Sequence, residues 1–168
     1  MKVIFLDHDG VICLSTEWGS RFKNGDGLDS EFDRFNDKAI KVLNQILEET
    51  GAEIVVSSDW RHHTSLEQMQ ELYKIRGVKK LPIGYTDSVV DIKGLDYLEH
   101  NRQVEIRHWL SQHPEVTHWV AVDDLNMSPD FCKKYGDSEG LTNFVLTPRS
   151  KEGIKQSGIK EKIIKFLK

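Results

Sequence analysis

The fold of this chain is decided by the stretch VIFLDHDG at residues 3–10. Its first four residues form an unbroken apolar run, which is typical of a strand buried on both faces in a parallel sheet. Two acids separated by one residue, Asp7 and Asp9, end this run. Because side chains at positions i and i+2 of an extended chain face the same way, both carboxylates can point into one small volume. Gly10 permits the chain to turn sharply out of the strand.

Two further apolar runs also end in polar residues. Residues 54–56 run into Ser-Ser-Asp at 57–59, and residues 119–122 run into Asp-Asp at 123–124. Ligands of open α/β sheets bind beyond the carboxyl ends of the strands, so we expect these polar groups to meet at one edge of a sheet. Shorter apolar runs predict additional strands within residues 81–86 and at 144–146.

Helical patterns lie between the predicted strands. Apolar residues recur at helical spacing after Asn36 or Asp37, either of which can cap a helix, and Gly51 predicts its end. A Ser-x-x-Gln pattern at 65–68 resembles a capping box. Two more helices are predicted at residues 102–112 and 159–167. This alternation predicts an α/β fold, a three-layer Rossmann-like domain with a central parallel sheet and helices on both faces, formed by residues 1–168 as one unit.

The acidic strand ends indicate a metal-dependent reaction on phosphate. Several carboxylates at one edge of a sheet repel each other, and a hard dication with oxygen ligands offsets that repulsion. Mg²⁺ fits because it takes one or two carboxylates plus substrate phosphate and keeps several waters. One carboxylate can then attack phosphorus to form an aspartyl-phosphate, while a second protonates the leaving oxygen and later deprotonates water. Hydroxyl and backbone N–H groups after the second strand can hold phosphate oxygens.

The stretch FLDHDGVI at residues 5–12 resembles the first motif of the haloacid-dehalogenase (HAD) superfamily, an apolar strand that runs into DxDG. The resemblance implies that Asp7 is the nucleophile and a Mg²⁺ ligand. It implies that Asp9 is the general acid and base and meets the metal through its backbone carbonyl. Ser57 is implied to bind phosphate. Asp123 is implied as a direct metal ligand, and Asp124 as a ligand directly or through water.

The chain more closely resembles the HAD-like domains that accompany the Swiss Army Knife RNA repair proteins. The features that carry this resemblance are SSDWR at 57–61, RxxEIxxWL at 102–110, DD at 123–124 and GLT at 140–142. Together they span nearly the whole chain. The resemblance implies a Rossmann-like sheet and the removal of phosphate from RNA or DNA ends.

The third superfamily motif, a Lys or less often an Arg before the acidic strand, is not obvious in this sequence. We predict Arg102 as this cation, with Lys93 and Arg107 as its competitors. An Arg grips two phosphate oxygens with its planar fork, so it replaces a Lys in charge but not in shape. The alternative role for Arg102 is an ordinary ion pair at the start of a helix.

The end of the second strand offers further candidates. Ser58 can join Ser57 in binding phosphate. Arg61 follows these serines closely, and it either contacts phosphate or pairs with a nearby carboxylate. Trp60 either packs in the core or stacks on a base of the substrate. We therefore predict a phosphate-binding group formed by Ser57, Ser58, Arg61 and Arg102.

HAD proteins often carry a cap domain between their motifs, and this sequence predicts none of large size. Between the first and second motifs, from Gly10 to Ile54, a helix of normal length occupies the second half. What remains is a flap at about residues 14–35, too short for a core of its own. Candidates within the flap for shaping access are Trp18, Arg21, Phe22 and Lys23. A shallow site favours a bulky substrate, such as a nucleic-acid terminus or a phosphoprotein.

Other functions compete with this one. A net charge of −4 favours a small-molecule phosphatase acting, for instance, on nucleotides. The missing cap and the locally basic residues 149–168 favour a larger substrate, although such a basic stretch is also typical of a solvated helix face. A receiver domain carries its phosphoacceptor aspartate on a middle strand. That class is disfavoured because here DxDG ends the first strand and Ser57 ends the next. An inactive phosphate- or metal-binding module is the remaining alternative while the third motif is unsettled.

The sequence indicates neither a membrane protein nor a secreted one. No apolar run approaches the ~20 residues needed to cross a bilayer, and no signal-peptide core follows Met1. The two cysteines, Cys13 and Cys132, lie outside any CxxC pattern and give no disulfide framework. We therefore expect a cytoplasmic protein.

Overall fold

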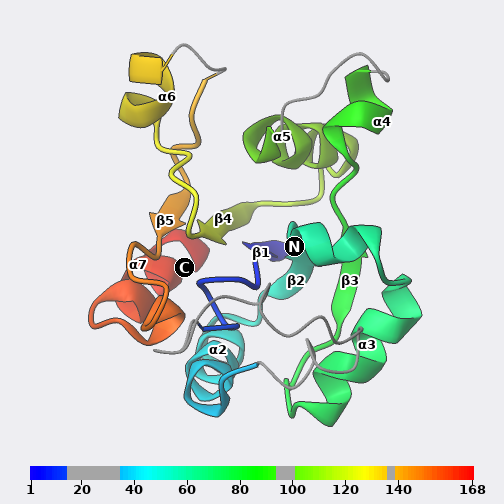
Figure 1. Ribbon diagram of the computed structural model, residues 1–168, viewed down its shortest axis with the longest axis vertical. Helices are drawn as coiled ribbons and strands as arrows, with labels where there is room; N and C mark the ends of the chain where they lie inside the picture. Colours follow the sequence, from blue (N-terminus) through cyan, green and yellow to red (C-terminus); the bar gives the residue numbers. More distant parts are fainter. Residues whose placement is uncertain (15–34, 94–100, 136–138) are drawn as a thin grey trace, which may run out of the picture.

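The computed structural model describes residues 1–14, 35–93, 101–135 and 139–168. Five strands within these residues form one sheet in the order β3-β2-β1-β4-β5, and every neighbouring pair is parallel (Figure 1). The strands are β1 (Lys2–Leu6), β2 (Glu53–Val56), β3 (Pro82–Tyr85), β4 (His118–Asp123) and β5 (Phe144–Leu146). The central strand is therefore the apolar run at the start of the chain.

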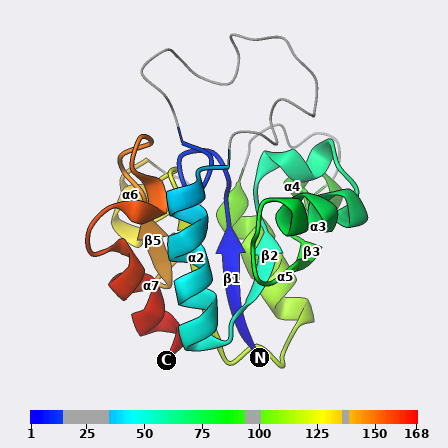
Figure 2. The same ribbon diagram turned by 90° about the horizontal axis from the view of Figure 1, so that it is seen from below.

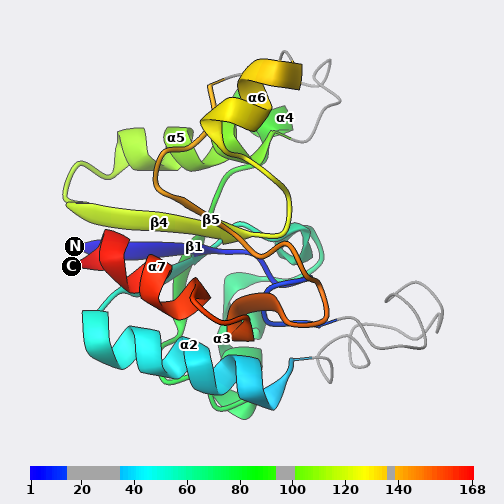
Figure 3. The same cartoon turned by 90° about the vertical axis from the view of Figure 1, so that its left-hand side faces the viewer.

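Helices cover both faces of this sheet, which confirms the three-layer prediction (Figure 3). On one face lie α2 (Asp37–Thr50), α3 (Leu66–Ile75) and α7 (Ile159–Leu167). On the other lie α4 (Val89–Lys93), α5 (Arg102–Gln112) and α6 (Pro129–Tyr135). Two short 3₁₀ turns, η2 (Asp59–His62) and η3 (Gly153–Lys155), complete the described elements. Figure 2 shows α2 and α3 in front of the sheet, on either side of β1.

The side chains on the two faces of β1 pack into two separate hydrophobic cores. Ile4 and Leu6 belong to the core beneath α2 and α7, whereas Val3 and Phe5 belong to the core beneath α5. Trp109 of α5 meets Phe5 edge-on with ring centroids 5.4 Å apart. Burial on both faces is the reason that β1 needs an unbroken apolar run instead of an alternating one.

The helix ends follow the local signals in the sequence. The side chain of Asn36 accepts hydrogen bonds from the N–H groups of the first turn of α2, and Gly51 closes that helix with a φ of 70°. Ser65 and Gln68 form both hydrogen bonds of a capping box at α3. Helix α5 occupies residues 102–112 as predicted, and it ends ahead of Pro114, which lacks the N–H that a helix needs.

Other elements differ from the prediction or lie outside it. Helices α4 and α6 were not predicted, because both are short and the α6 sequence PDFCKKY carries no apolar stripe of helical period. Residues 15–34 of the predicted flap, with Trp18, Arg21, Phe22 and Lys23, lie outside the described residues. No cap domain is present in the part of the chain that the structure describes. None of the helices described there is long and apolar enough to span a bilayer.

The order of the strands places a topological switch point at the centre of the sheet. From β1 the chain adds β2 and β3 on one side, then crosses back to add β4 and β5 on the other. The direction of winding therefore reverses between β1 and β4. Open α/β sheets bind ligands at such a switch point, beyond the carboxyl ends of the strands. That place lies between the DxDG turn and the Asp-Asp pair.

Candidate active site

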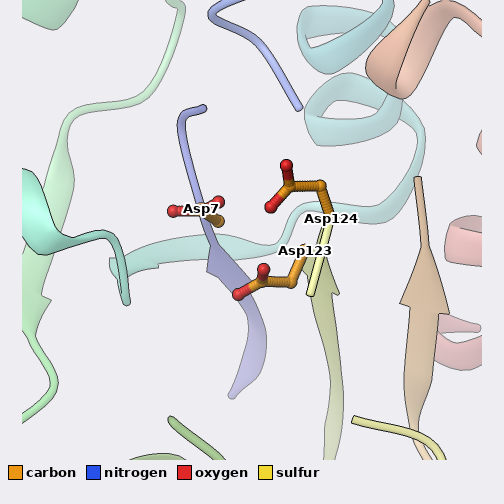
Figure 4. Close-up of side chains that lie close together, drawn as sticks. All are labelled: Asp7, Asp123 and Asp124. Atoms are coloured by element: carbon orange, nitrogen blue, oxygen red, sulfur yellow. The ribbon is translucent and has the colours of Figure 1, made fainter. Parts of the chain in front are cut away.

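Three aspartates meet at the carboxyl ends of β1 and β4 (Figure 4). Asp7 follows β1 directly, Asp123 is the last residue of β4, and Asp124 comes next. Each offers a carboxylate oxygen that lies within 4.8 Å of those of the other two. Asp7 and Asp123 are buried, whereas Asp124 is exposed. The result is a cluster of oxygen donors with one side open to solvent.

This cluster fits a hard divalent cation. Burial raises the pKa of Asp7 and raises the pKa of Asp123 to about 7, and the charge of Asp7 adds to the shift at Asp123. Two buried acids side by side resist full ionisation until positive charge is supplied. Carboxylate oxygens this close together can bind Mg²⁺, which takes few protein ligands and keeps its remaining positions for water and phosphate. The three aspartates can therefore hold the metal that the sequence predicts.

One positive charge at the cluster comes from Arg102, the first residue of α5. Its Nη1 lies 2.7 Å from Asp123 Oδ2 and 3.1 Å from Asp7 Oδ1. Its Nη2 lies 3.3 Å from Asp59 Oδ2. These three carboxylates keep the buried guanidinium charged, because they hold its pKa above the ordinary value against the effect of burial. Arg102 thus stands among the carboxylates of three strand ends.

Arg107, one of the two competitors of Arg102, has different surroundings. Arg107 points to the loop before β5 and donates to the carbonyl oxygens of Glu139 and Gly140, at 2.7 Å for Gly140. Lys93 is the last residue of α4. Between Arg102 and Arg107, it is therefore Arg102 that contacts the aspartates, and the side chain of Lys93 lies outside the described part of the structure.

Asp9 lies beside the cluster and is held by a tryptophan. Its Oδ2 accepts a hydrogen bond of 3.0 Å from Nε1 of Trp60. Trp60 is only 4% exposed and packs against His8 and Phe35, which agrees with the core alternative for this residue and not with stacking on a base. The side chain of Asp9 does not belong to the group of three carboxylates. The predicted metal ligand at this residue is the backbone carbonyl and not the side chain.

His8, between the two acids, faces away from the site. Its Nε2 lies 2.7 Å from the hydroxyl of Tyr73, and its ring packs against Phe35 and Trp60. Burial lowers the pKa of His8 to about 3. The imidazole is therefore neutral at physiological pH and helps to form the core beneath the DxDG turn.

Two serines, Ser57 and Ser58, follow β2. Both are buried, and Ser58 favours the ionised carboxylate of Asp7 against the larger effect of burial, which raises the pKa of Asp7. Arg61 lies behind them. Its Nη1 donates to the carbonyl oxygens of Ser57 at 2.8 Å and of Ser58 at 2.9 Å, and its Nη2 lies 2.8 Å from Glu105 Oε2. These contacts match the carboxylate-pairing alternative for Arg61, and its contact with phosphate stays a prediction.

The turn after Asp9 fits tightly against Asp124. Gly10 has a φ of +71°, and a Cβ at this position would lie 2.4 Å from Asp124 Oδ2. Thr147, just after β5, donates from its buried hydroxyl to the Gly10 carbonyl at 3.0 Å. Sequence reasoning did not single out Thr147, and no local signal marks it. Glu105 was quoted only within the RxxEIxxWL stretch and was not predicted as a site residue, although that spacing places it one turn after Arg102.

Comparison with known proteins identifies the family of the chain. A family model described as the HAD domain in Swiss Army Knife RNA repair proteins matches residues 3–157, a stretch that contains every site residue described above. The searches of curated proteins and of solved structures each gave no match. The model covers the sheet, the acidic cluster and helix α5 together. The chain therefore belongs to the family of HAD domains found in Swiss Army Knife RNA repair proteins.

Proposed function

We propose that the protein is a Mg²⁺-dependent phosphatase that works through an aspartyl-phosphate on Asp7 and acts on the terminal phosphates of nucleic acids. Membership of a HAD family implies a phosphatase-type hydrolase. The observation that carries the proposal is the meeting of Asp7 with Asp123, Asp124 and Arg102 at one edge of the sheet.

In this proposal Asp7, Asp123 and Asp124 hold Mg²⁺, together with the backbone carbonyl of Asp9. The bound metal supplies Lewis-acid charge that offsets the repulsion between an attacking carboxylate and the phosphoryl oxygens. Arg102, which lies beside Asp7 and Asp123, adds a second positive charge and binds oxygens of the phosphoryl group being transferred. Ser57 and Ser58 bind further phosphate oxygens through their hydroxyl and backbone N–H groups.

The reaction proceeds in two displacements at phosphorus. In the first, a carboxylate oxygen of Asp7 forms a bond to phosphorus while the ester P–O bond breaks, and Asp9 gives its proton to the leaving oxygen. In the second, the Asp9 carboxylate takes a proton from water, whose oxygen bonds to phosphorus as the bond to Asp7 breaks. Inorganic phosphate leaves, and both aspartates return to their starting states. The N–H of Trp60 orients Asp9 for these two proton transfers.

Two features support a bulky substrate. The described part of the chain places no cap domain over the acidic cluster, and Asp124 is exposed at its mouth. The matching family is described by its occurrence in RNA repair proteins, which supports a nucleic-acid substrate. A terminal phosphate on a strand end can reach such an open site, whereas an enclosed pocket would exclude it.

Phosphate release from a panel of substrates tests the proposal. The panel holds RNA and DNA with 3′- or 5′-phosphate ends, nucleotides and an aryl phosphate, each with and without Mg²⁺. Asp7→Asn removes the nucleophile, and Asp37→Asn is the matched control because the Asp37 side chain is 93% exposed on α2. We expect Mg²⁺-dependent release from strand ends by the wild type and the control, with none by Asp7→Asn.

Other outcomes separate the alternatives. Release only from nucleotides or the aryl phosphate would keep the nucleophile and reject the nucleic-acid substrate. Release that survives in Asp7→Asn would reject the aspartyl-phosphate. No release from any substrate would favour a module that binds phosphate or metal without turning it over.

A further inference from the structure

Helix α5 carries two charged side chains on its buried face, and they reach different parts of the site. Arg102 lies among the aspartates, and Glu105, three residues later, is 2% exposed. Residues three apart are neighbours on one helix face. Glu105 accepts from Arg61, which belongs to the serine loop (residues 57–61) that follows β2. One face of α5 therefore presents a cation to the aspartates and an anion to the serine loop.

Arg61 fixes the direction of two successive peptide groups in the serine loop. A single nitrogen, Nη1, bonds the carbonyl oxygens of both Ser57 and Ser58. In a planar trans peptide the N–H points opposite to the C=O. The N–H groups of Ser58 and Asp59, which share those peptide planes, are therefore directed away from Arg61. Successive N–H groups aimed the same way form a concave anion site in many proteins.

Glu105 ties the serine loop to two helices. Its Oε2 takes Arg61, while its Oε1 accepts a 2.8 Å hydrogen bond from the N–H of Val89 at the start of α4. The side chains of Arg61 and Glu105 are 3% and 2% exposed. A buried ion pair contributes little net stability compared with apolar residues of similar size. The pair instead fixes the positions of the serine loop, α4 and α5 relative to one another.

We propose that Arg61 and Glu105 are positioning residues for phosphate binding. The pair holds the serine loop and α5 in one arrangement, so that the loop N–H groups and the Arg102 guanidinium face the same phosphate group. This inference rests on the proposed function of the site, and in it neither residue touches the substrate. It assigns Arg61 to the rear of the phosphate site.

Binding of orthophosphate in the presence of Mg²⁺, measured by calorimetry, tests the role of the pair without requiring turnover. Arg61→Lys keeps a charge beside Glu105, but an ammonium lacks the planar fork that bonds Glu105 and both carbonyls at once. We expect its dissociation constant for orthophosphate to rise roughly tenfold or more, the effect of weakening hydrogen bonds to a charged group. Amide hydrogen exchange at Ser58 and Asp59 should become faster in the same variant.

Arg107→Met is the matched control, because Arg107 also lies on α5 and also donates to loop carbonyls, but before β5. Its orthophosphate affinity should stay within about twofold of the wild type, as distant sites act independently. The double variant Arg61→Met/Glu105→Met replaces the whole pair with apolar groups and removes the risk of one unpaired buried charge. We expect it to melt cooperatively and to bind orthophosphate as weakly as Arg61→Lys or more so.

A folded double variant with the affinity of Arg107→Met would overturn the inference. If the double variant does not fold, the test rests on Arg61→Lys. An orthophosphate dissociation constant and amide exchange rates at Ser58 and Asp59 that equal those of the wild type would then overturn the inference. A wild type that binds no orthophosphate would also overturn it. A wild type that binds orthophosphate but hydrolyses nothing would reject the phosphatase and leave the role of the pair standing on its own measurements.

Discussion

Replacing Gly10 by alanine should weaken Mg²⁺ binding more than it weakens the fold. Gly10 has a φ of +71°, and the Cβ of an alanine would lie 2.4 Å from Oδ2, 2.7 Å from Cγ and 2.8 Å from Cβ of Asp124. No real Cβ tolerates such contacts, so one of the two residues must move. Because Asp124 is exposed, its side chain can move out of the cluster, and a bound Mg²⁺ would then lose a proposed ligand.

The two effects of this substitution can be estimated separately. A left-handed backbone costs an alanine about 1–2 kcal/mol, which lowers the Tm of a chain of this size by about 2–8 °C. Displacing a group that supports a metal costs roughly 10- to 100-fold in affinity. Gly77→Ala is the matched control, because Gly77 has a φ of +75° with nothing within 4 Å of its added Cβ. It should lose similar stability and no Mg²⁺ affinity.

Calorimetric titration of Mg²⁺ and thermal denaturation, performed on both variants, measure the two effects. In an Asp124→Ala background, Gly10→Ala should produce no further loss of Mg²⁺ affinity, because the displaced ligand is already gone. Displacement of Asp124 is contradicted if Gly10→Ala binds Mg²⁺ as tightly as the wild type does, or if the loss of affinity persists in full in the Asp124→Ala background.

Three further predictions concern single groups. Mg²⁺ should bind more weakly at pH 5 than at pH 8, because protons compete with the metal for the Asp123 carboxylate, whose pKa is raised to about 7. Because of the same raised pKa, Asp123 lowers the free energy of unfolding of the metal-free protein as pH rises from about 4 to 7. Mg²⁺ should therefore raise the Tm more at pH 8 than at pH 5. Trp60→Phe removes the hydrogen bond to Asp9, and kcat should fall roughly tenfold or more with little change in KM, as steady-state kinetics will show. Tyr73→Phe leaves Nε2 of the buried His8 without its partner and should cost about 1–3 kcal/mol, seen in urea unfolding, while activity persists.

Local signals were sufficient to predict much of the fold. The apolar run of β1, the cap at Asn36 and the capping box at Ser65 each depend on a few neighbouring residues, and each is present. Helix α6 shows the limit of this reasoning. It is seven residues long and begins at Pro129, and only Cys132 among its residues is buried. Too few of its side chains enter a core to leave a periodic pattern.

The site was predictable where its residues follow strands, and less so on α5. Of the apolar residues on that helix, Val104 and Leu110 are only partly buried, whereas Ile106 and Trp109 are buried together with the charged Arg102 and Glu105. These charges are tolerated inside because their partners, such as Asp7 and Arg61, come from distant parts of the chain. Helical periodicity therefore located α5, but it could not indicate that the buried face of the helix also carries two charges.

The central place of β1 has a consequence for synthesis on the ribosome. As the chain emerges, β1 can pair with β2 once about fifty more residues have followed, but its other edge stays open until β4 arrives, more than a hundred residues after it. An exposed apolar strand edge invites pairing with other chains. Nascent or prematurely terminated chains that stop before β4 should therefore be the species that chaperones must shield, and they lack Asp123 and Asp124 altogether.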